Sequence, residues 1–230
     1  MNPRSVLVTG GFGTLGRAVV AQLARAGWRV AALDLAPAPR GEPLPEGVLP
    51  VGGADLGSPA AAEAAVARVV AHFGRLDALV NVAGGFTWQT LADGDVEGWD
   101  RMYAMNLRTA VVATRAALPH LLAAGDARIV NVGAGAASAK ATAGMGAYTA
   151  SKAGVQKLTE SLGAELKDRG VNVNAVLPGT IDTPQNRADM PNADTTRWVA
   201  PEALADVILF LLSDASRAVT GAAIPVYGRG

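Results

Sequence analysis

Short apolar runs alternate with longer amphipathic ones along this chain of 230 residues, and that alternation limits its fold more than any other feature. The apolar runs predict strands at 5–10, 28–34, within 47–56, and at 76–85, 127–135, 171–179 and 222–228. The amphipathic runs predict helices at 14–27, 58–74, about 97–123, 146 to about 167, and 201–213. Strands that are apolar almost throughout are covered on both faces. We therefore expect one doubly wound α/β domain over residues 1–230, with a parallel sheet of about seven strands and helices on both faces.

Local signals mark several boundaries of these elements. Ser58 and Pro59 are preferred types at an N-cap and a first helical position, and Gly74 is a typical helix end. Pro119 lies inside the expected helix 97–123 and would bend or end it. The polar, proline-containing stretch 180–200 is a long connection, and because such connections often carry function, we assign it as a substrate loop.

Composition excludes several classes of function. The chain has 20 basic and 20 acidic residues and no run of like charge, so we expect no nucleic-acid or membrane partner. It has no cysteine, which excludes disulfides and thiolate metal sites, and its two histidines lie far apart, so we expect no metal. The first residues and the longest apolar run are too short for a signal peptide or a membrane span. These features indicate a soluble, cytoplasmic protein.

A glycine-rich turn follows the first expected strand. In TGGFGTLG (9–16), Gly11-x-Gly13-x-x-Gly16 lies between a strand and a helix, the context of a Rossmann dinucleotide site. Glycines let the backbone approach a pyrophosphate, and the helix N-terminus offers free N–H groups and the positive end of its dipole. The alternative is a tight turn that binds nothing.

An acidic residue ends the second expected strand. Asp34 lies 18 residues after the last glycine of the turn, where a carboxylate accepts hydrogen bonds from the ribose of NAD and repels the 2′-phosphate of NADP. NAD(H) is therefore the preferred cofactor, and an ordinary turn residue is the alternative. Arg40 follows in a proline-rich loop and would weaken the preference if it folded back, so NADP(H) stays open.

One of three tyrosines and one of four lysines stand four residues apart, as Tyr148 and Lys152 in GAYTASKAG. Residues at this spacing share a helix face, so the ammonium can lie beside the phenol. A free phenol has a pKa of about 10, and bringing it near 7 needs a preference of about 4 kcal/mol for the phenolate. The lysine charge and the positive nicotinamide ring of an oxidised cofactor act in that direction, and the phenol would then give a proton as hydride arrives or take one in the reverse reaction. The alternative is a packed tyrosine beside a solvated lysine.

Six segments together resemble the short-chain dehydrogenases/reductases along essentially the whole chain. They are TGGFGTLG (9–16), ADL (54–56), NVAGG (81–85), MNL (105–107), YTASK (148–152) and PGTIDT (178–183). The resemblance implies an NAD(P)H-dependent oxidoreductase in which Tyr148 is the acid/base, Lys152 its partner, and Asn106 a holder of water in a proton relay. It also implies a homodimer or homotetramer, formed through the helices near 97–123 and 146–167.

The resemblance further implies a set of cofactor contacts. Asp55 would cap the adenine ring, and residues of NVAGG would line the adenosine ribose and brace the sheet. Residues of PGTIDT would border the nicotinamide and pyrophosphate. The full set is Gly10, Gly11, Gly13, Thr14, Leu15, Gly16, Asp34, Asp55, Leu56, Asn81, Ala83, Gly84, Tyr148, Lys152, Pro178, Gly179, Ile181 and Thr183.

The chain departs from the family pattern at two places. The serine usual 13 residues before the tyrosine is Gly135 here, or Ala134 if the loop holds one extra residue. Thr14 falls where TGxxxGxG has its middle glycine. Dihydropteridine reductases resemble the chain in both departures, in VLPGTIDTPQNRADMPNAD (176–194) and in Trp198. Their acceptor is a quinonoid pterin, a flat conjugated ring that has less need of a serine to polarise a carbonyl.

These features lead to one preferred function and two alternatives. We expect hydride transfer from NADH to a small planar substrate such as a quinonoid dihydropterin, with Tyr148 as proton donor. Candidate substrate contacts are Phe86, Trp88, Met145, Met190, Arg187 and Trp198, although ordinary packing or solvation would explain any one of them. The alternatives are a 3-oxoacyl-type or other carbonyl reductase or alcohol dehydrogenase, and an NAD-binding sensor or partner protein without catalysis.

Overall fold

The computed structural model describes residues 3–39, 41 and 43–229. In these ranges seven parallel strands form one sheet in the order β3-β2-β1-β4-β5-β6-β7. The strands are β1 (Ser5–Thr9), β2 (Arg29–Leu33), β3 (Leu49–Val51), β4 (Ala78–Asn81), β5 (Ala127–Val132), β6 (Val171–Pro178) and β7 (Ala223–Val226). The order reverses between β1 and β4, and doubly wound sheets bind ligands beyond the carboxyl ends of the strands at such a reversal. The expected fold class is confirmed.

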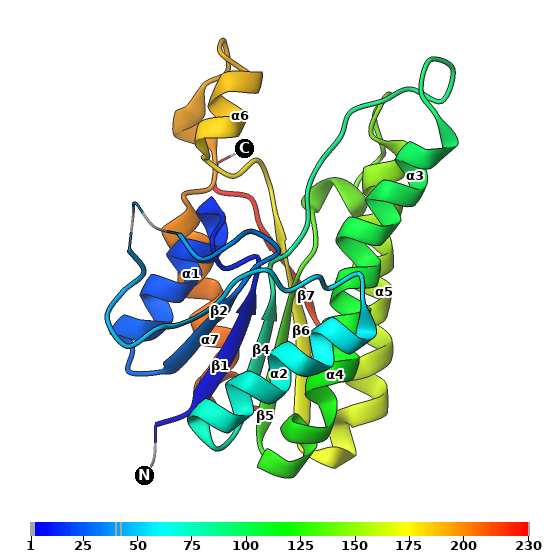
Figure 1. Ribbon diagram of the computed structural model, residues 1–230. Coiled ribbons are helices and arrows are strands. Elements are labelled where there is room, and N and C mark those ends of the chain that lie inside the picture. The colour runs from blue at the N-terminus through cyan, green and yellow to red at the C-terminus, as the bar shows by residue number, and fades with distance from the viewer. Residues whose placement is uncertain (1–2, 40, 42, 230) are drawn as a thin grey trace.

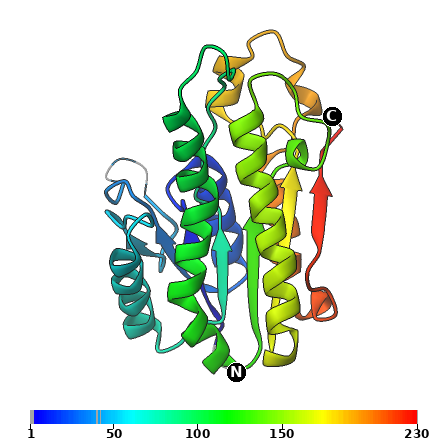
Figure 2. The ribbon, with the colours of Figure 1, turned by 90° about the vertical axis from the view of Figure 1, so that its right-hand side faces the viewer.

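Helices cover both faces of the sheet (Figure 1). On one face α1 (Thr14–Arg25) packs against α7 (Pro201–Leu212). On the other lie α2 (Pro59–Phe73), α4 (Thr109–Ala124) and α5 (Gly146–Leu166), the last two side by side in Figure 2. The shorter α3 (Val96–Met102) and α6 (Pro184–Asp189) stand above the carboxyl ends of the strands. None of the described helices is long and apolar enough to span a bilayer.

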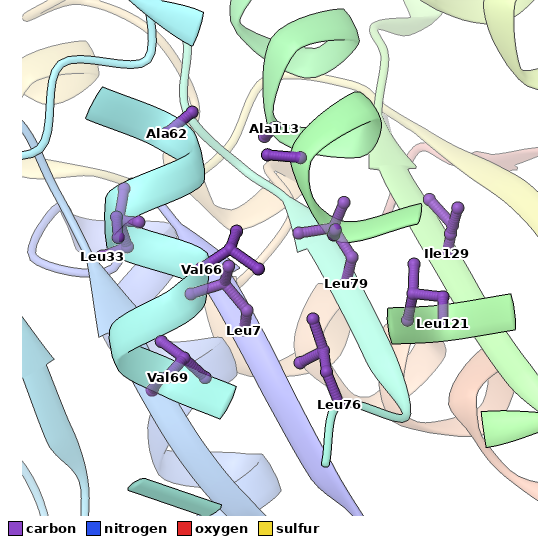
Figure 3. Close-up of a cluster of buried hydrophobic side chains, with 14 of the residues drawn as sticks. Leu7, Leu33, Ala62, Val66, Val69, Leu76, Leu79, Ala113, Leu121 and Ile129 are labelled. Carbon is purple, nitrogen blue, oxygen red and sulfur yellow. The ribbon is translucent and has the colours of Figure 1, made fainter. Parts of the chain in front are cut away.

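The apolar strands divide their side chains between two buried layers, as their alternating directions require. Leu7 of β1 points toward α2 and α4 and meets Val66 and Leu79 there (Figure 3). Its neighbours Val6 and Val8 point to the opposite layer, under α1 and α7. This two-sided burial explains why β1 is apolar along its length, and it holds the carboxyl ends of the strands in fixed register.

Two segments differ from the expected elements. The expected helix 97–123 contains a π-helical stretch, η1 (Tyr103–Arg108), between α3 and α4, and Pro119 does not end it, because α4 continues to Ala124. Within the loop 180–200, α6 forms because Thr183 caps it and a proline occupies its first position. Four short 3₁₀ turns complete the described elements: η2 (Gly135–Ala137), η3 (Lys167–Arg169), η4 (Thr195–Arg197) and η5 (Asp214–Ser216).

Candidate active site

Three glycines of the turn between β1 and α1 are required by close backbone packing. Gly10 has φ +64°, and a Cβ there would lie 2.9 Å from the Ala83 backbone. A Cβ at Gly11 would lie 2.8 Å from the side chain of Ala32. At Gly16 it would lie 2.0 Å from Gly10 O. The turn therefore brings β1, β2, β4 and α1 together at the point where the strand order reverses.

Gly13 is different, because the polypeptide itself does not require a glycine there. It is exposed, it has φ −75°, and a Cβ would meet only Gly10 O, at an ordinary 3.6 Å. Gly13 is also the N-cap of α1, and no side chain caps the helix. Thr14, also exposed, is the first helical residue, while Leu15 is buried in the core. A bare helix N-terminus with room above its amides fits the pyrophosphate of NAD(P).

The two acidic residues expected at the cofactor lie near this turn. Asp34 directly follows β2, and its carboxylate accepts hydrogen bonds from Phe12 N (3.0 Å) and Ala36 N (3.1 Å). Asp55 is exposed and accepts from Gly57 N at 2.7 Å, while Leu56 beside it is buried. Arg40, which left NADP(H) open, lies outside the described residues.

The segment after β4 connects the glycine turn to the catalytic residues. Asn81 is buried and donates to Thr114 Oγ1 (3.1 Å) and to Asn131 Oδ1 (2.8 Å), so its side chain links β4 to α4 and β5. Ala83 N donates to Thr9 Oγ1 at 3.1 Å. Gly84 is exposed, and a Cβ there would lie 2.6 Å from Asn106 Oδ1 and 3.3 Å from Lys152 Nζ. A side chain at residue 84 would therefore separate the cofactor loop from both catalytic candidates.

Asn106 lies in the π-helical stretch η1, a type of distortion that often marks functional sites. It is buried, and its side chain accepts from Gly85 N (2.9 Å) and donates to Gly85 O (3.1 Å) and Ser151 Oγ (3.1 Å). Both amide hydrogens are thus in use, which leaves only acceptor capacity on Oδ1 for a relay water. The geometry shows Asn106 fixing the loop at Gly85 against α5.

Tyr148 and Lys152 lie one turn apart on α5, as their spacing predicts. Lys152 Nζ is buried and donates to Val132 O, at the end of β5, over 2.8 Å. Tyr148 is half-buried, and its ring meets the Phe86 ring edge-on with centroids 5.0 Å apart. Lys152, Asn106 and Gly84 thus border one small space beyond the carboxyl ends of β4 and β5.

Burial shifts the pKa of each member of this pair toward its neutral form. It lowers the pKa of Lys152 from 10.5 to about 8, so the amine is still roughly nine-tenths protonated at pH 7. It raises the pKa of Tyr148 from 10.0 to about 12. The expectation that the lysine charge makes this phenol acidic is therefore wrong for the polypeptide by itself, because the loss of hydration decides the direction. At neutral pH the phenol carries its proton, which is the form that a proton donor needs.

The PGTIDT segment forms the opposite side of the site. Pro178 ends β6, and Gly179 N donates to Val226 O of β7 at 3.0 Å. Ile181 pairs with Val199 in an isolated bridge, and Thr183 caps α6. These contacts fasten the start of the substrate loop to β7 and join its two ends to each other.

A cavity of about 470 Å³ opens beside this segment. The residues that line it are Gly135, Ala136, Ala139, Gly179, Thr180, Asp194, Arg197, Trp198 and Tyr227. Trp198 is the one expected substrate contact among them. Sequence reasoning missed Tyr227 and Arg197, although the nearness of β7 to β6 in a doubly wound sheet would have placed Tyr227 beside Gly179.

The other expected substrate contacts have different surroundings. Phe86 meets Tyr148, as described above. Trp88 is exposed at 60%, and its indole donates to Ala143 O at 3.1 Å. Met145 is half-buried and is the N-cap of α5. Met190 follows α6 and is exposed. Arg187 forms a two-pronged pair with Asp182, Nε–Oδ1 2.6 Å and Nη2–Oδ2 2.8 Å, so its guanidinium is engaged within its own loop and not in the cavity.

Comparison with known families decides where this site belongs. Residues 4–194 match the family model described as short chain dehydrogenase. The chain belongs to the short-chain dehydrogenase/reductase family. It is accordingly an NAD(P)-dependent oxidoreductase, and the alternative of a sensor without catalysis is set aside.

Three relatives of this short-chain dehydrogenase cover between 71% and 98% of its length. It is 34% identical over 246 aligned residues to 2-(S)-hydroxypropyl-CoM dehydrogenase 3 of Xanthobacter autotrophicus, covering 97% of this chain and 94% of that one. It is 37% identical over 171 residues to 3-oxoacyl-(acyl-carrier-protein) reductase of Thermotoga maritima, covering 71% and 69%. The crystal structure of 3-ketoacyl-(acyl-carrier-protein) reductase from Brucella melitensis complexed with NADH matches with a TM-score of 0.87, 28% identity and 98% of both chains. These comparisons establish the family and not a branch of it.

Proposed function

We propose that this enzyme reduces a small planar ring with NADH, and that the ring is a quinonoid dihydropterin or a similar conjugated system. The cavity of about 470 Å³ carries the proposal. Trp198 and Tyr227 give it aromatic walls, and Gly135 contributes no hydroxyl for polarising an isolated ketone. A flat conjugated ring gains from aromatic contact and has less need of such a hydroxyl. The local resemblance of 176–198 to dihydropteridine reductases supports the same substrate class.

Each part of the site has a role in this reaction. NADH supplies the hydride when it is bound. The amides at the N-terminus of α1, with Gly13 above them, hold the pyrophosphate, and Asp34 holds the adenosine ribose and favours NAD(H) over NADP(H). Tyr148 donates the proton, Lys152 holds its positive charge nearby, and Asn106 positions the loop at Gly85.

A second candidate is a carbonyl reductase or alcohol dehydrogenase of the 3-oxoacyl type. The names of the Thermotoga maritima and Brucella melitensis proteins support it, and so does the dehydrogenase of Xanthobacter autotrophicus. In that reaction a water would take the place of the absent serine hydroxyl, because both amide hydrogens of Asn106, the other group considered for this role, are already donated to Gly85 O and Ser151 Oγ.

We further propose that the enzyme is a homodimer or homotetramer. The segment η1–α4 exposes apolar side chains, among them Met105 at 42% and Val111 at 41%. Exposed apolar side chains on this continuous helical segment favour association with a second copy. Sedimentation equilibrium tests this, and a monomer at micromolar concentration would contradict it.

Loss of NADH absorbance with a panel of acceptors separates the two candidate reactions. The panel contains a quinonoid dihydropterin, several quinones and 3-oxoacyl thioesters, and each is assayed with NADH and with NADPH. We expect the highest kcat/KM for a planar ring with NADH. A higher kcat/KM for the thioesters would favour the second candidate, and no turnover at all would contradict both.

A further inference from the structure

Tyr227 is one of the cavity residues that no motif assigned. It directly follows β7, and its backbone lies 3.4 Å from the position of a Cβ on Gly179. The chain beyond it is fastened, because Arg229 N donates to Arg197 O at 3.1 Å and Arg197 Nε donates to Arg229 O at 3.0 Å. The backbone is thus held on both sides of Tyr227, before it by the hydrogen bond from Gly179 N to Val226 O and after it by the bonds between Arg197 and Arg229.

The Tyr227 ring occupies the space above Gly135. A Cβ on Gly135 would lie 2.5 Å from Tyr227 Cε1 and 3.2 Å from Cζ, the carbon that bears the hydroxyl. A side chain at residue 135 and the ring of Tyr227 therefore exclude each other. At one of the two positions where the family pattern would place its serine, this chain has a glycine that makes room for Tyr227, directly after β7.

The Tyr227 hydroxyl is available to a ligand. It has no hydrogen-bond partner among the described residues, and Tyr227 is one of the residues that line the cavity. The neighbouring loop is tied to α5 at both ends, by Lys152 Nζ on Val132 O and by Ser138 Oγ on Gln156 Oε1 (2.8 Å). Ser138, the serine nearest to Gly135, is thus engaged elsewhere, and the side chain that meets Gly135 at the cavity is that of Tyr227.

We propose that the Tyr227 hydroxyl donates a hydrogen bond to the substrate atom that gains electron density as hydride arrives, a ring carbonyl oxygen or imine nitrogen. Tyr227 keeps its own proton throughout, and Tyr148 delivers the proton that ends on the product. The inference rests on the proposed reduction of a planar ring. Because Tyr227 is 41% exposed, we expect less than the roughly 10²- to 10³-fold effect of a fully enclosed donor.

The test uses Tyr227→Phe, which keeps the ring and removes the hydroxyl. Tyr103→Phe is the matched control, because Tyr103 is 53% exposed on η1 and does not line the cavity. Three quantities are measured: kcat and KM with the best acceptor of the panel, the Kd of NADH, and the Kd of pterin in the presence of NAD⁺, which has no hydride to transfer. Thermal unfolding of each variant checks the fold.

We expect Tyr227→Phe to lower kcat about 10- to 100-fold and to weaken pterin binding about fivefold, with NADH binding and the control unchanged. If wild type turns over and Tyr227→Phe matches it in kcat and in pterin binding, the Tyr227 inference is overturned and the proposed function stands. If wild type turns over no acceptor yet binds pterin more tightly than Tyr227→Phe does, the proposed function fails, and with it the role of the hydroxyl in hydride transfer, which leaves Tyr227 as a ligand-binding donor only. Absence of both turnover and pterin binding in wild type overturns both.

Discussion

Alanine at Gly16 and alanine at Gly13 should damage the enzyme in different ways, although the two glycines share one turn. At Gly16 an added Cβ would lie 2.0 Å from Gly10 O and 2.8 Å from Gly11 Cα, well inside contact distance. Both obstacles are backbone atoms, so the turn itself must move. Overpacking of this kind costs about 1–3 kcal/mol, and we expect the upper end of that range for Gly16→Ala. For a chain of this size about 3 kcal/mol lowers Tm by roughly 6–12 °C.

At Gly13 the same methyl group fits the polypeptide. Its nearest neighbour would be Gly10 O at 3.6 Å, and φ of −75° suits alanine. An alanine N-cap is slightly worse than glycine, but the unfolded chain also loses entropy, so we expect stability within about 1 kcal/mol of wild type. The methyl would stand over the amides of α1, where the pyrophosphate approaches. We therefore expect Kd for NADH to rise at least about tenfold, or about 1.4 kcal/mol.

Urea unfolding without cofactor and a fluorescence titration with NADH measure the two effects separately. We expect each variant to change a different quantity. Gly16→Ala should lower the free energy of unfolding, and Gly13→Ala should lower the affinity for NADH while its free energy of unfolding stays near that of wild type. NADH affinity in Gly13→Ala equal to that of wild type would refute the placement of the pyrophosphate. A Gly16→Ala protein as stable as wild type would refute the close packing of the turn.

Two further predictions concern charge in the site. Burial lowers the pKa of Lys152 to about 8, so between pH 8 and 10.5 the unfolded chain binds more protons than the folded one and stability rises with pH. The free energy of unfolding of wild type, measured in urea, should therefore rise by about 2 kcal/mol from pH 7.5 to 9.5. Lys152→Met should lack this rise. An equal gain in both would show that the amine is not buried. Asp34→Asn keeps an acceptor for Phe12 N but removes the negative charge. We therefore expect the affinity for NADPH relative to that for NADH to rise roughly tenfold. Titrations of both cofactors that show an unchanged ratio of affinities would count against this role of Asp34.

The sheet could be predicted because its strands carry a two-sided apolar pattern. Val6, Leu7 and Val8 are buried in two different layers, which requires apolar residues at successive positions. The spacing of Tyr148 and Lys152 likewise fixed their shared helix face. Both are local relations, and a sequence contains them directly.

The features that the sequence did not predict depend on contacts between segments far apart in the chain. Pro119 did not end α4, because a helix can lose one hydrogen bond where tertiary packing holds it. Tyr227 meets Gly135 only through the pairing of β7 with β6, and no local pattern signals that contact. The direction of the pKa shift of Tyr148 follows from the extent of its burial, which spacing to Lys152 does not determine.

The proposed reaction depends most on Tyr148 as the proton donor. Its most direct test is Tyr148→Phe, assayed for NADH oxidation with the best acceptor of the panel and for NADH binding by titration. We predict that kcat falls by roughly 10²- to 10⁴-fold, while the Kd of NADH stays within about twofold of wild type, since α1 and Asp34 hold the cofactor. A Tyr148→Phe enzyme that turns over as fast as wild type would contradict the account.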